Sequence, residues 1–223
     1  MIRVLLADDE ALIRAGLRSI LETDDDITVV AEASNSREAI TLTEAHRPDV
    51  VLLDVRMPGP TPAGDGLDTI EHLRRHQPGI AVTVLTTFDE DEYVARAVRA
   101  GAAGFLLKAA DPRELLAAIR ATADGDGYLS PRITARVLRR LQSRPDEDSD
   151  SERVRARKLV ATLTDRERDV LALLARGLSN HEIGRELFVS EGTVKAHLSA
   201  LLARLGVDNR VRAAVIWTAA SQQ

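Results

Sequence analysis

Short apolar runs alternate with amphipathic stretches along the first 124 residues of the chain. The apolar runs are rich in β-branched and aliphatic residues, which is typical of strands buried on both faces of a sheet. They cover Ile2–Ala7, Thr28–Ala33, Val50–Asp54, Ile80–Leu85 and Gly104–Leu107. The stretches between them predict helices at about Glu10–Glu22, Ser36–His46, Gly66–His76, Asp91–Ala100 and Pro112–Ala123. This alternation predicts a doubly wound α/β domain, in which helices cover both faces of a parallel sheet.

From Leu163 onward the pattern is that of helices alone. Capping boxes, in which a Ser or Thr precedes a Glu by three residues, lie at Thr164–Glu167 and Ser179–Glu182. Further helices are expected at about 191–205, where Gly206 would end the helix, and at about 210–220. A short turn at 188–190 joins the second helix to the third, which predicts an all-α four-helix domain with a helix-turn-helix.

Residues 125–159 connect the two patterns. Residues 125–142 begin with glycines and a Ser-Pro pair and then have a helical pattern, whereas residues 143–156 are polar and charged. The polar stretch has too few apolar side chains to offset the entropy lost on folding. We therefore predict an α/β domain at 1–124, a linker at 125–159 with a helical first half and a charged, flexible second half, and an all-α domain at 160–223.

Composition narrows the function classes. The absence of cysteine excludes disulfides, thiolate catalysis and Cys-ligated zinc. No run reaches the ~18 apolar residues of a membrane helix, and acids interrupt the first apolar run, so we expect a cytoplasmic protein without a signal peptide. The net charge is −9 over residues 1–125, +3 over 126–159 and +1 over 160–223. An acidic front half with a neutral to basic rear is typical of a regulatory domain joined to a nucleic-acid binder.

Polar side chains follow four of the predicted strands at the point where each strand ends. They are Asp8, Asp9, Asp54, Thr86 and Lys108. The carboxyl ends of strands in an open parallel sheet share one crevice, so we expect these side chains to meet there. Carboxylates without His or Cys suit Mg²⁺, and a carboxylate such as that of Asp54 can accept a phosphoryl group. Taken singly, each residue is more typical of a helix cap or a solvated loop than of a functional site; the complete set favours a phosphoryl-and-metal site.

The motifs around these residues resemble the receiver domain of bacterial two-component response regulators. They are ADDE at 7–10, LLDVRMPG at 52–59, VLTTF at 84–88 and GAAGFLLK at 101–108. The resemblance covers about residues 1–124 and implies a flavodoxin-like five-stranded fold, in which a sensor histidine kinase phosphorylates Asp54. It also implies that Asp9, Asp54 and the backbone carbonyl of Arg56 bind Mg²⁺, with Asp8 reaching the ion through water. Thr86 and Phe105 match the family's two switch positions, and Lys108 its phosphate-binding lysine.

One departure from the family pattern lies next to Asp54. The family usually has a single residue between its MPG and DG elements, whereas here the segment 60–64 (PTPAG) separates Gly59 from Asp65. The longer loop would shield the phosphoryl group or alter partner docking. It would otherwise be a tolerated surface insertion, because loops absorb added length at small cost.

The rear of the chain resembles the LuxR-type helix-turn-helix domain over about residues 160–220, particularly in SNHEIGREL followed by VSEGTVKAHL. Joined to a receiver, this implies a member of the NarL/FixJ subfamily of response regulators. In the helix at 191–205, apolar spacing directs Val194, Leu198, Leu201, Leu202 and Leu205 to the core. The remaining positions of its first half face outward, the half that enters the major groove. By resemblance, Lys195, Ala196 and Ser199 contact bases and Thr193 and His197 contact phosphates; for Lys195 alone, a solvated surface lysine is the competing interpretation.

A domain with a net charge of only +1 gains little sequence-independent attraction to DNA. Two copies on adjoining half-sites would gain affinity through effective concentration. We therefore expect a homodimer on double-stranded DNA, formed when the receiver is phosphorylated, with the helix at 210–220 as a candidate interface.

Three functions remain to be separated. The first is a transcription regulator switched by phosphorylation of Asp54. The second is a magnesium phosphatase, but such enzymes usually carry a second acid two residues after the nucleophile, where this chain has Arg56. We therefore expect a protein that slowly loses its phosphoryl group and is not a turnover enzyme. The third is a constitutive or ligand-tuned DNA-binding regulator with a silent receiver, which the complete set of strand-end residues disfavours.

Overall fold

A computed structural model describes residues 1–57, 66–86, 91–129, 149–207 and 209–221. The chain divides into two compact units, Met1–Tyr128 and Leu129–Gln223, and each is described by itself. The loop at 60–64 lies outside the described residues, as does most of the stretch at 125–142 that we expected to be helical in its later part.

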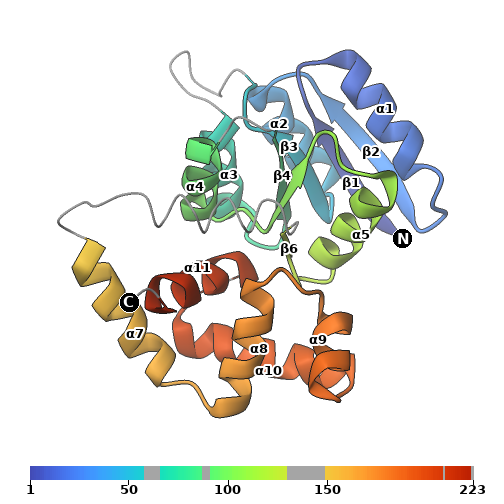
Figure 1. Cartoon of the computed structure of the whole chain (residues 1–223). Helices are drawn as coiled ribbons and strands as arrows, with labels where there is room; N and C mark the ends of the chain where they lie inside the picture. Colours follow the sequence, from blue (N-terminus) through green and yellow to red (C-terminus); the bar gives the residue numbers. More distant parts are fainter. Residues whose placement is uncertain (58–65, 87–90, 130–148, 208, 222–223) are drawn as a thin grey trace. The chain divides into compact units, whose positions relative to one another are not determined.

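The first unit contains a sheet with the strand order β2-β1-β3-β4-β5-β6 (Figure 1). The strands are β1 (Ile2–Ala7), β2 (Ile27–Ala33), β3 (Val50–Asp54), β4 (Ala81–Thr86), β5 (Gly104–Leu107) and β6 (Tyr128–Leu129). The first five strands pair in parallel, which confirms the predicted α/β class. The two-residue β6 was not predicted; it lies beside β5, and the Tyr128 amide donates to the carbonyl of Ala103 at 3.2 Å.

Helices cover both faces of this sheet. They are α1 (Ala11–Leu21), α2 (Ser36–His46), α3 (Gly66–His76), α4 (Asp91–Ala100) and α5 (Pro112–Ala123). α1 packs against α5, whereas α2 packs against α3 and α3 against α4, so the two groups lie on opposite faces. All five residues of β3 are buried, as its unbroken apolar run predicted. The strands run parallel between these layers, so the carboxyl ends of β1, β3, β4 and β5 share one edge of the sheet.

From residue 149 onward the described part of the second unit is helical. Its helices are α7 (Ser149–Ala161), α8 (Asp165–Ala175), α9 (Asn180–Leu187), α10 (Glu191–Leu205) and α11 (Arg210–Ser221). Both predicted capping boxes are present with both reciprocal hydrogen bonds, at Thr164 and at Ser179. Gly206 ends α10 in the left-handed conformation (φ 67°), which glycine adopts without steric cost. In the ranges given above, no helix is long and apolar enough to cross a membrane.

Helix α7 corrects the prediction of a flexible linker. We expected residues 143–156 to be flexible, but residues 149–156 form the first two turns of α7. Composition was a poor guide because a few apolar side chains are enough to anchor α7: Ala156 is buried, and Leu159 and Val160 pack on the domain core. α7 packs against α11, and Arg157 Nε donates to the carbonyl of Ala220 at 3.3 Å. Tertiary contact thus supplies the burial that the segment alone lacks.

Candidate functional site

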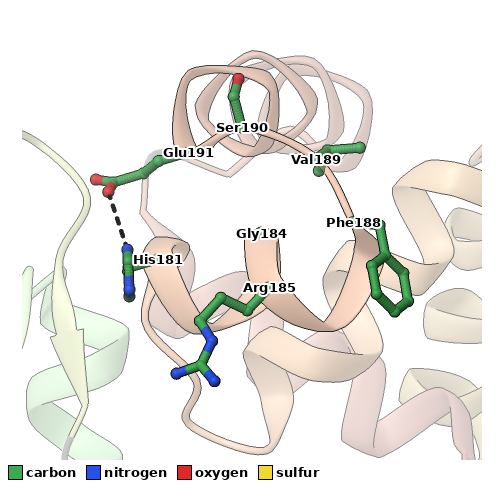
Figure 2. A pocket seen from close by; sticks show the side chains of 7 residues that line it. All are labelled: His181, Gly184, Arg185, Phe188, Val189, Ser190 and Glu191. Atoms are coloured by element: carbon green, nitrogen blue, oxygen red, sulfur yellow. Dashed lines mark ion pairs between the residues drawn. The ribbon is translucent and has the colours of Figure 1, made fainter.

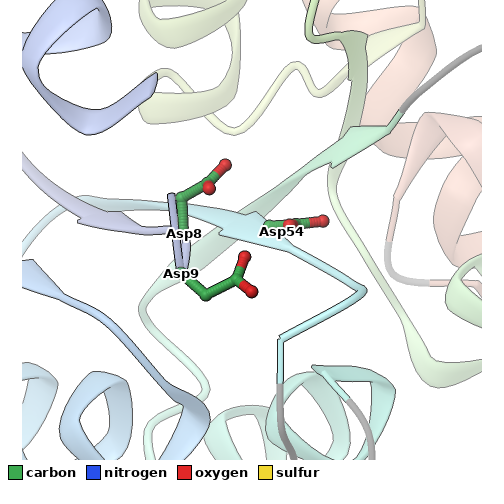
Figure 3. Close-up of side chains that lie close together, drawn as sticks. All are labelled: Asp8, Asp9 and Asp54. Carbon is green, nitrogen blue, oxygen red and sulfur yellow. The ribbon is translucent and has the colours of Figure 1, made fainter. Parts of the chain in front are cut away.

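Three carboxylates meet at the edge of the sheet where β1 and β3 end. Asp8 and Asp9 follow β1, Asp54 is the last residue of β3, and one oxygen from each lies within 4.8 Å of the others (Figure 3). Asp8 and Asp54 are buried, whereas Asp9 is exposed. Two of the acids are thus held inside the sheet edge and the third faces solvent.

The ammonium group of Lys108, just beyond β5, lies among these carboxylates. Lys108 Nζ is 2.9 Å from Asp54 Oδ2, 2.9 Å from Asp8 Oδ2 and 3.5 Å from Glu10 Oε1. Only 11% of the Lys108 side chain is exposed, so these ion pairs are shielded from solvent. The backbone also contributes donors, because the Glu10 amide donates to Asp8 Oδ1 at 2.9 Å and the Arg56 amide to Asp54 Oδ1 at 3.0 Å.

Burial and charge act in opposite directions on the ionisable groups. Burial raises the pKa of the Asp8 carboxyl above its usual range, although Lys108 and the Glu10 amide act to lower it. Burial alone would lower the pKa of the Lys108 ammonium, but hydrogen bonds and charge from Asp54 and Asp8 outweigh it and raise that pKa. The Lys108 ammonium therefore stays charged where it lies among Asp8, Asp54 and Glu10.

The remaining predicted residues of this site lie nearby in the sheet. Thr86 ends β4 and is buried, and its carbonyl accepts from the Lys108 amide at 2.8 Å. Phe105 lies in β5 with its side chain completely buried. Arg56 follows β3 after one residue.

The donor set fits Mg²⁺. Each of the three acids offers a carboxylate oxygen, and such hard oxygen ligands are the ones that this ion takes in proteins, usually with water and phosphate completing the shell. Within the described residues, no other group of three or more acidic or His side chains is close enough together to hold a metal ion.

Helix α10 presents a polar face in its first half. Thr193, Ala196 and Ser199 are exposed, whereas Lys195 and His197 are half-buried. Val194, Leu198, Leu201 and Leu205 are buried in the core and Leu202 packs against it, as the apolar spacing predicted. Contacts within the helix hold some of these polar residues. Thr193 Oγ1 lies 2.8 Å from Ser190 Oγ at the N-cap, and Lys195 Nζ lies 3.9 Å from Glu191 Oε1.

Close packing of α9 against the start of α10 sets the position of that face. A Cβ atom on Gly184 would lie 2.8 Å from the carbonyl oxygen of Val189, so only glycine permits this approach. A hollow of about 730 Å³ lies beside it (Figure 2), lined by His181, Gly184, Arg185, Phe188, Val189, Ser190 and Glu191. Across it, His181 Nδ1 lies 3.9 Å from Glu191 Oε2.

Family models match both units. Residues 4–120 match the response regulator receiver domain, and residues 161–217 match the bacterial regulatory proteins of the luxR family. The order of these two domains, acid cluster first and helix-turn-helix second, decides the assignment. The chain belongs to the NarL/FixJ response regulators.

Relatives of this response regulator align over nearly its whole length. It is 38% identical to the transcriptional regulatory protein LiaR of Bacillus subtilis (strain 168) over 215 residues, which are 96% of each chain. Among solved structures, the response regulator ChrA of a heme-sensing two-component system is 39% identical over 96% of this chain and 95% of ChrA, with a TM-score of 0.54. RcsB from Salmonella enterica serovar Typhimurium, bound to the promoter rprA with a phosphomimetic, is 26% identical over 100% of both chains, with a TM-score of 0.57.

Two residues that contact the response regulator's acid cluster were not predicted from the sequence. The sequence pattern predicts Glu10 only as the start of a helix, yet both its amide and its carboxylate contact the cluster. Arg14, one helical turn later, donates from Nη1 to the backbone carbonyl of Asp8 at 2.7 Å. The sequence signal that could have predicted this contact is the place of Arg14 in the first turn of α1, directly after Asp8 and Asp9.

Proposed function

We propose that this response regulator is phosphorylated on Asp54 by a sensor histidine kinase, in the presence of Mg²⁺, and that phosphorylation promotes dimerisation and sequence-specific DNA binding. The observation that carries the proposal is the position of the Asp54 carboxylate, buried at a strand end with one oxygen 2.9 Å from Lys108. Asp8 and Asp9 complete an acidic set that suits Mg²⁺.

In this proposal, Asp54, Lys108 and Thr86 have separate roles in phosphoryl transfer. A carboxylate oxygen of Asp54 attacks the phosphorus of the donor phosphohistidine, and the P–N bond breaks with its electron pair going to the imidazole. When bound, Mg²⁺ supplies positive charge that offsets the repulsion between the carboxylates and the phosphoryl oxygens. Lys108 then pairs with a phosphoryl oxygen, and the Thr86 hydroxyl donates a hydrogen bond to another.

The product of this site is a conformational change rather than released phosphate. Removing Lys108 from its pair with Asp54 and drawing Thr86 toward the phosphoryl group changes the contacts at the ends of β4 and β5. Phe105, whose ring is buried in β5, would repack with this movement. Arg56 stands where related phosphatases carry a general acid, so we infer that the aspartyl phosphate persists and is lost slowly.

The DNA-reading surface in this proposal is the first half of α10. Lys195, Ala196 and Ser199 would contact bases in the major groove, and Thr193 and His197 would contact phosphates. The structure of RcsB on promoter DNA supports DNA as the partner of a chain of this length and domain order. Because the target is DNA, the compartment that we propose is the cytoplasm.

In this proposal, dimerisation is the step by which phosphorylation of the first unit raises the DNA affinity of the second. When two copies of the second unit are joined in a dimer and bind adjoining half-sites, binding of the first raises the effective concentration of the second, which increases the overall affinity for DNA. One side of α11 is covered by α7, so a dimer contact through α11 would use its remaining surface or displace α7.

The proposal is tested with the wild-type chain and Asp54→Asn, each treated with acetyl phosphate and Mg²⁺. The wild type should gain a phosphoryl group, sediment as a dimer and protect specific sites in genome-wide footprinting, whereas the variant should do none of these. Equal dimerisation and footprints in both proteins would establish a silent receiver and refute the proposal. Omitting Mg²⁺ from a parallel wild-type sample tests the metal requirement separately.

A further inference from the structure

Arg14 on α1 joins the acid cluster to the neighbouring strand. Its Nη1 donates to the backbone carbonyl of Asp8 at 2.7 Å, and its Nε donates to Glu32 Oε2, at the end of β2, at 3.2 Å. Only 17% of the Arg14 side chain is exposed. The guanidinium therefore bridges two strand ends from a partly buried position, with its plane held at two points.

The carbonyl that Arg14 holds belongs to the peptide unit between Asp8 and Asp9. Asp8 itself is already fixed, because its side chain is buried against Lys108 and its amide donates to the carbonyl of Ala33 at 3.1 Å. Asp9 is exposed, and its carboxylate approaches the other two acids from the solvent side. The orientation of the peptide unit before Asp9 sets where its carboxylate points.

We propose that Arg14 is a positioning residue for Mg²⁺ binding: by holding the Asp8 carbonyl, it keeps the Asp9 carboxylate aimed at Asp54. This inference rests on the proposed function, since it takes the acid cluster to be the Mg²⁺ site of the receiver. Outer partners that orient a metal ligand typically contribute 10- to 100-fold to metal affinity.

Charge and orientation predict opposite results when Arg14 is replaced. A cation close to the acids repels Mg²⁺, so an electrostatic role alone means that removing the charge tightens binding. Loss of the hydrogen bond to Asp8 frees the peptide unit and weakens binding. The pairing of Arg14 with Glu32 offsets its charge, which leaves orientation as the larger effect.

Arg18 provides a matched control one turn further along α1. Its Nε pairs with the same carboxylate, at 2.6 Å from Glu32 Oε1, and its Nη1 lies 2.9 Å from Glu22 Oε1. Within the described residues, no hydrogen bond joins it to Asp8. Replacing Arg18 therefore removes an ion pair to Glu32 and leaves the Asp8 carbonyl in place.

The experiment is a titration of the full-length chain with MgCl₂, followed by backbone amide NMR shifts around Asp9 and by calorimetry, without any phosphodonor. Arg14→Gln should raise the Kd for Mg²⁺ about ten-fold, Arg14→Lys should have an intermediate effect, and Arg18→Gln should stay within about two-fold of the wild type. Unfolding by urea in EDTA, compared between Arg14→Gln and Arg18→Gln, separates lost stability from lost metal affinity.

The possible outcomes separate two questions. Unchanged or tighter Mg²⁺ binding by Arg14→Gln would overturn the positioning role while leaving the metal site intact. Equal weakening by Arg14→Gln and Arg18→Gln would also overturn it, because the effect would then come from Glu32. A wild type with no saturable shift around Asp9 would refute the metal site of the proposed function, and this inference with it.

Discussion

The Nζ atom of Lys108 lies 2.9 Å from Asp54 Oδ2, although the two residues are 54 positions apart in the sequence. The pair joins the end of β3 to the residue that follows β5, with β4 between them. Phosphorylation of Asp54 would thus change a contact that spans three strands of the sheet.

Replacing Lys108 by Met should destabilise the α/β unit in the absence of metal. The variant keeps the apolar stem but leaves Asp8 and Asp54 buried without their cation, which costs about 3 kcal/mol in comparable buried pairs. Mg²⁺ should restore part of this loss, since it neutralises the same carboxylates. The measurement is urea-induced unfolding in EDTA and in MgCl₂, with Lys158→Met on the exposed side of α7 as the control. A loss no larger than in the control would contradict the prediction.

Mg²⁺ should stabilise the wild-type chain against unfolding, and EDTA should reverse the effect. A ligand that binds only the folded state adds about 2.7 kcal/mol at a concentration of 100 Kd. Asp9→Asn should abolish the gain with little change in metal-free stability, because Asp9 is exposed. Thermal unfolding with and without Mg²⁺ measures both quantities. A full Mg²⁺ gain in the variant would show that the ion binds elsewhere.

Glu167→Gln should make the stability of the second unit less dependent on acid pH. Burial by itself raises the pKa of Glu167, but the amide and hydroxyl of Thr164 and the charge of Arg204 outweigh it and lower that pKa. A carboxyl with a lowered pKa in the folded state stabilises above its ordinary pKa, 4.5, and that contribution is lost as the pH falls through the folded value.

At pH 7 the expected cost of Glu167→Gln is about 1 kcal/mol, the usual worth of a helix cap. The difference from wild type should shrink as the pH falls from the ordinary value of 4.5 through the lowered pKa of the folded state. Urea unfolding between pH 3 and pH 7 tests this. Glu182→Gln removes the equivalent capping carboxylate of α9, which is exposed, and should have a smaller effect. If Glu167→Gln lowers the free energy of unfolding by the same amount at every pH in this range, the prediction is wrong.

Phe188→Gly should stabilise the second unit by about 1 kcal/mol. Phe188 adopts a left-handed backbone (φ 55°), which is costly for any residue with a Cβ, and its side chain is 95% exposed, so little burial is lost. Phe188→Ala keeps the Cβ and should give no such gain. Comparing the two variants by thermal unfolding separates backbone strain from loss of the ring. Equal stability of the two variants would show that the strain is absent.

Lys195→Met should weaken binding to the cognate DNA site by about 1–3 kcal/mol and relax the preference at one base pair, if Lys195 contacts a base edge. Glu191→Gln should act in the opposite direction, because it removes a negative charge 3.9 Å from Lys195 Nζ. Both are measured with the phosphorylated protein on sites found by footprinting. An equal loss on all sequences for Lys195→Met would assign this lysine to phosphate contact instead.

The chain's local signals determined most of the element boundaries. The apolar runs ended at the predicted residues in β1, β3 and β5, and the predicted bounds of α10 match those observed. These boundaries follow from interactions within a few residues, such as the reciprocal hydrogen bonds at Thr164 and Ser179. The side chains for the acid cluster were also predictable, because parallel strands bring their carboxyl ends to one edge.

Other features depended on partners far away in the chain. Residues 149–156 are too polar to fold alone and become helical where α7 packs on α11, and Arg14 gains its role from the carbonyl of Asp8 and from Glu32 on another strand. Periodicity shows which side of a helix or strand is apolar. Which distant residues that side contacts depends on how the helices and strands pack together. Amino-acid sequence alone therefore determined the two kinds of domain and which polar side chains gather at the strand ends. Only the tertiary structure decided which distant residues contact those side chains, because long-range contacts leave no local pattern.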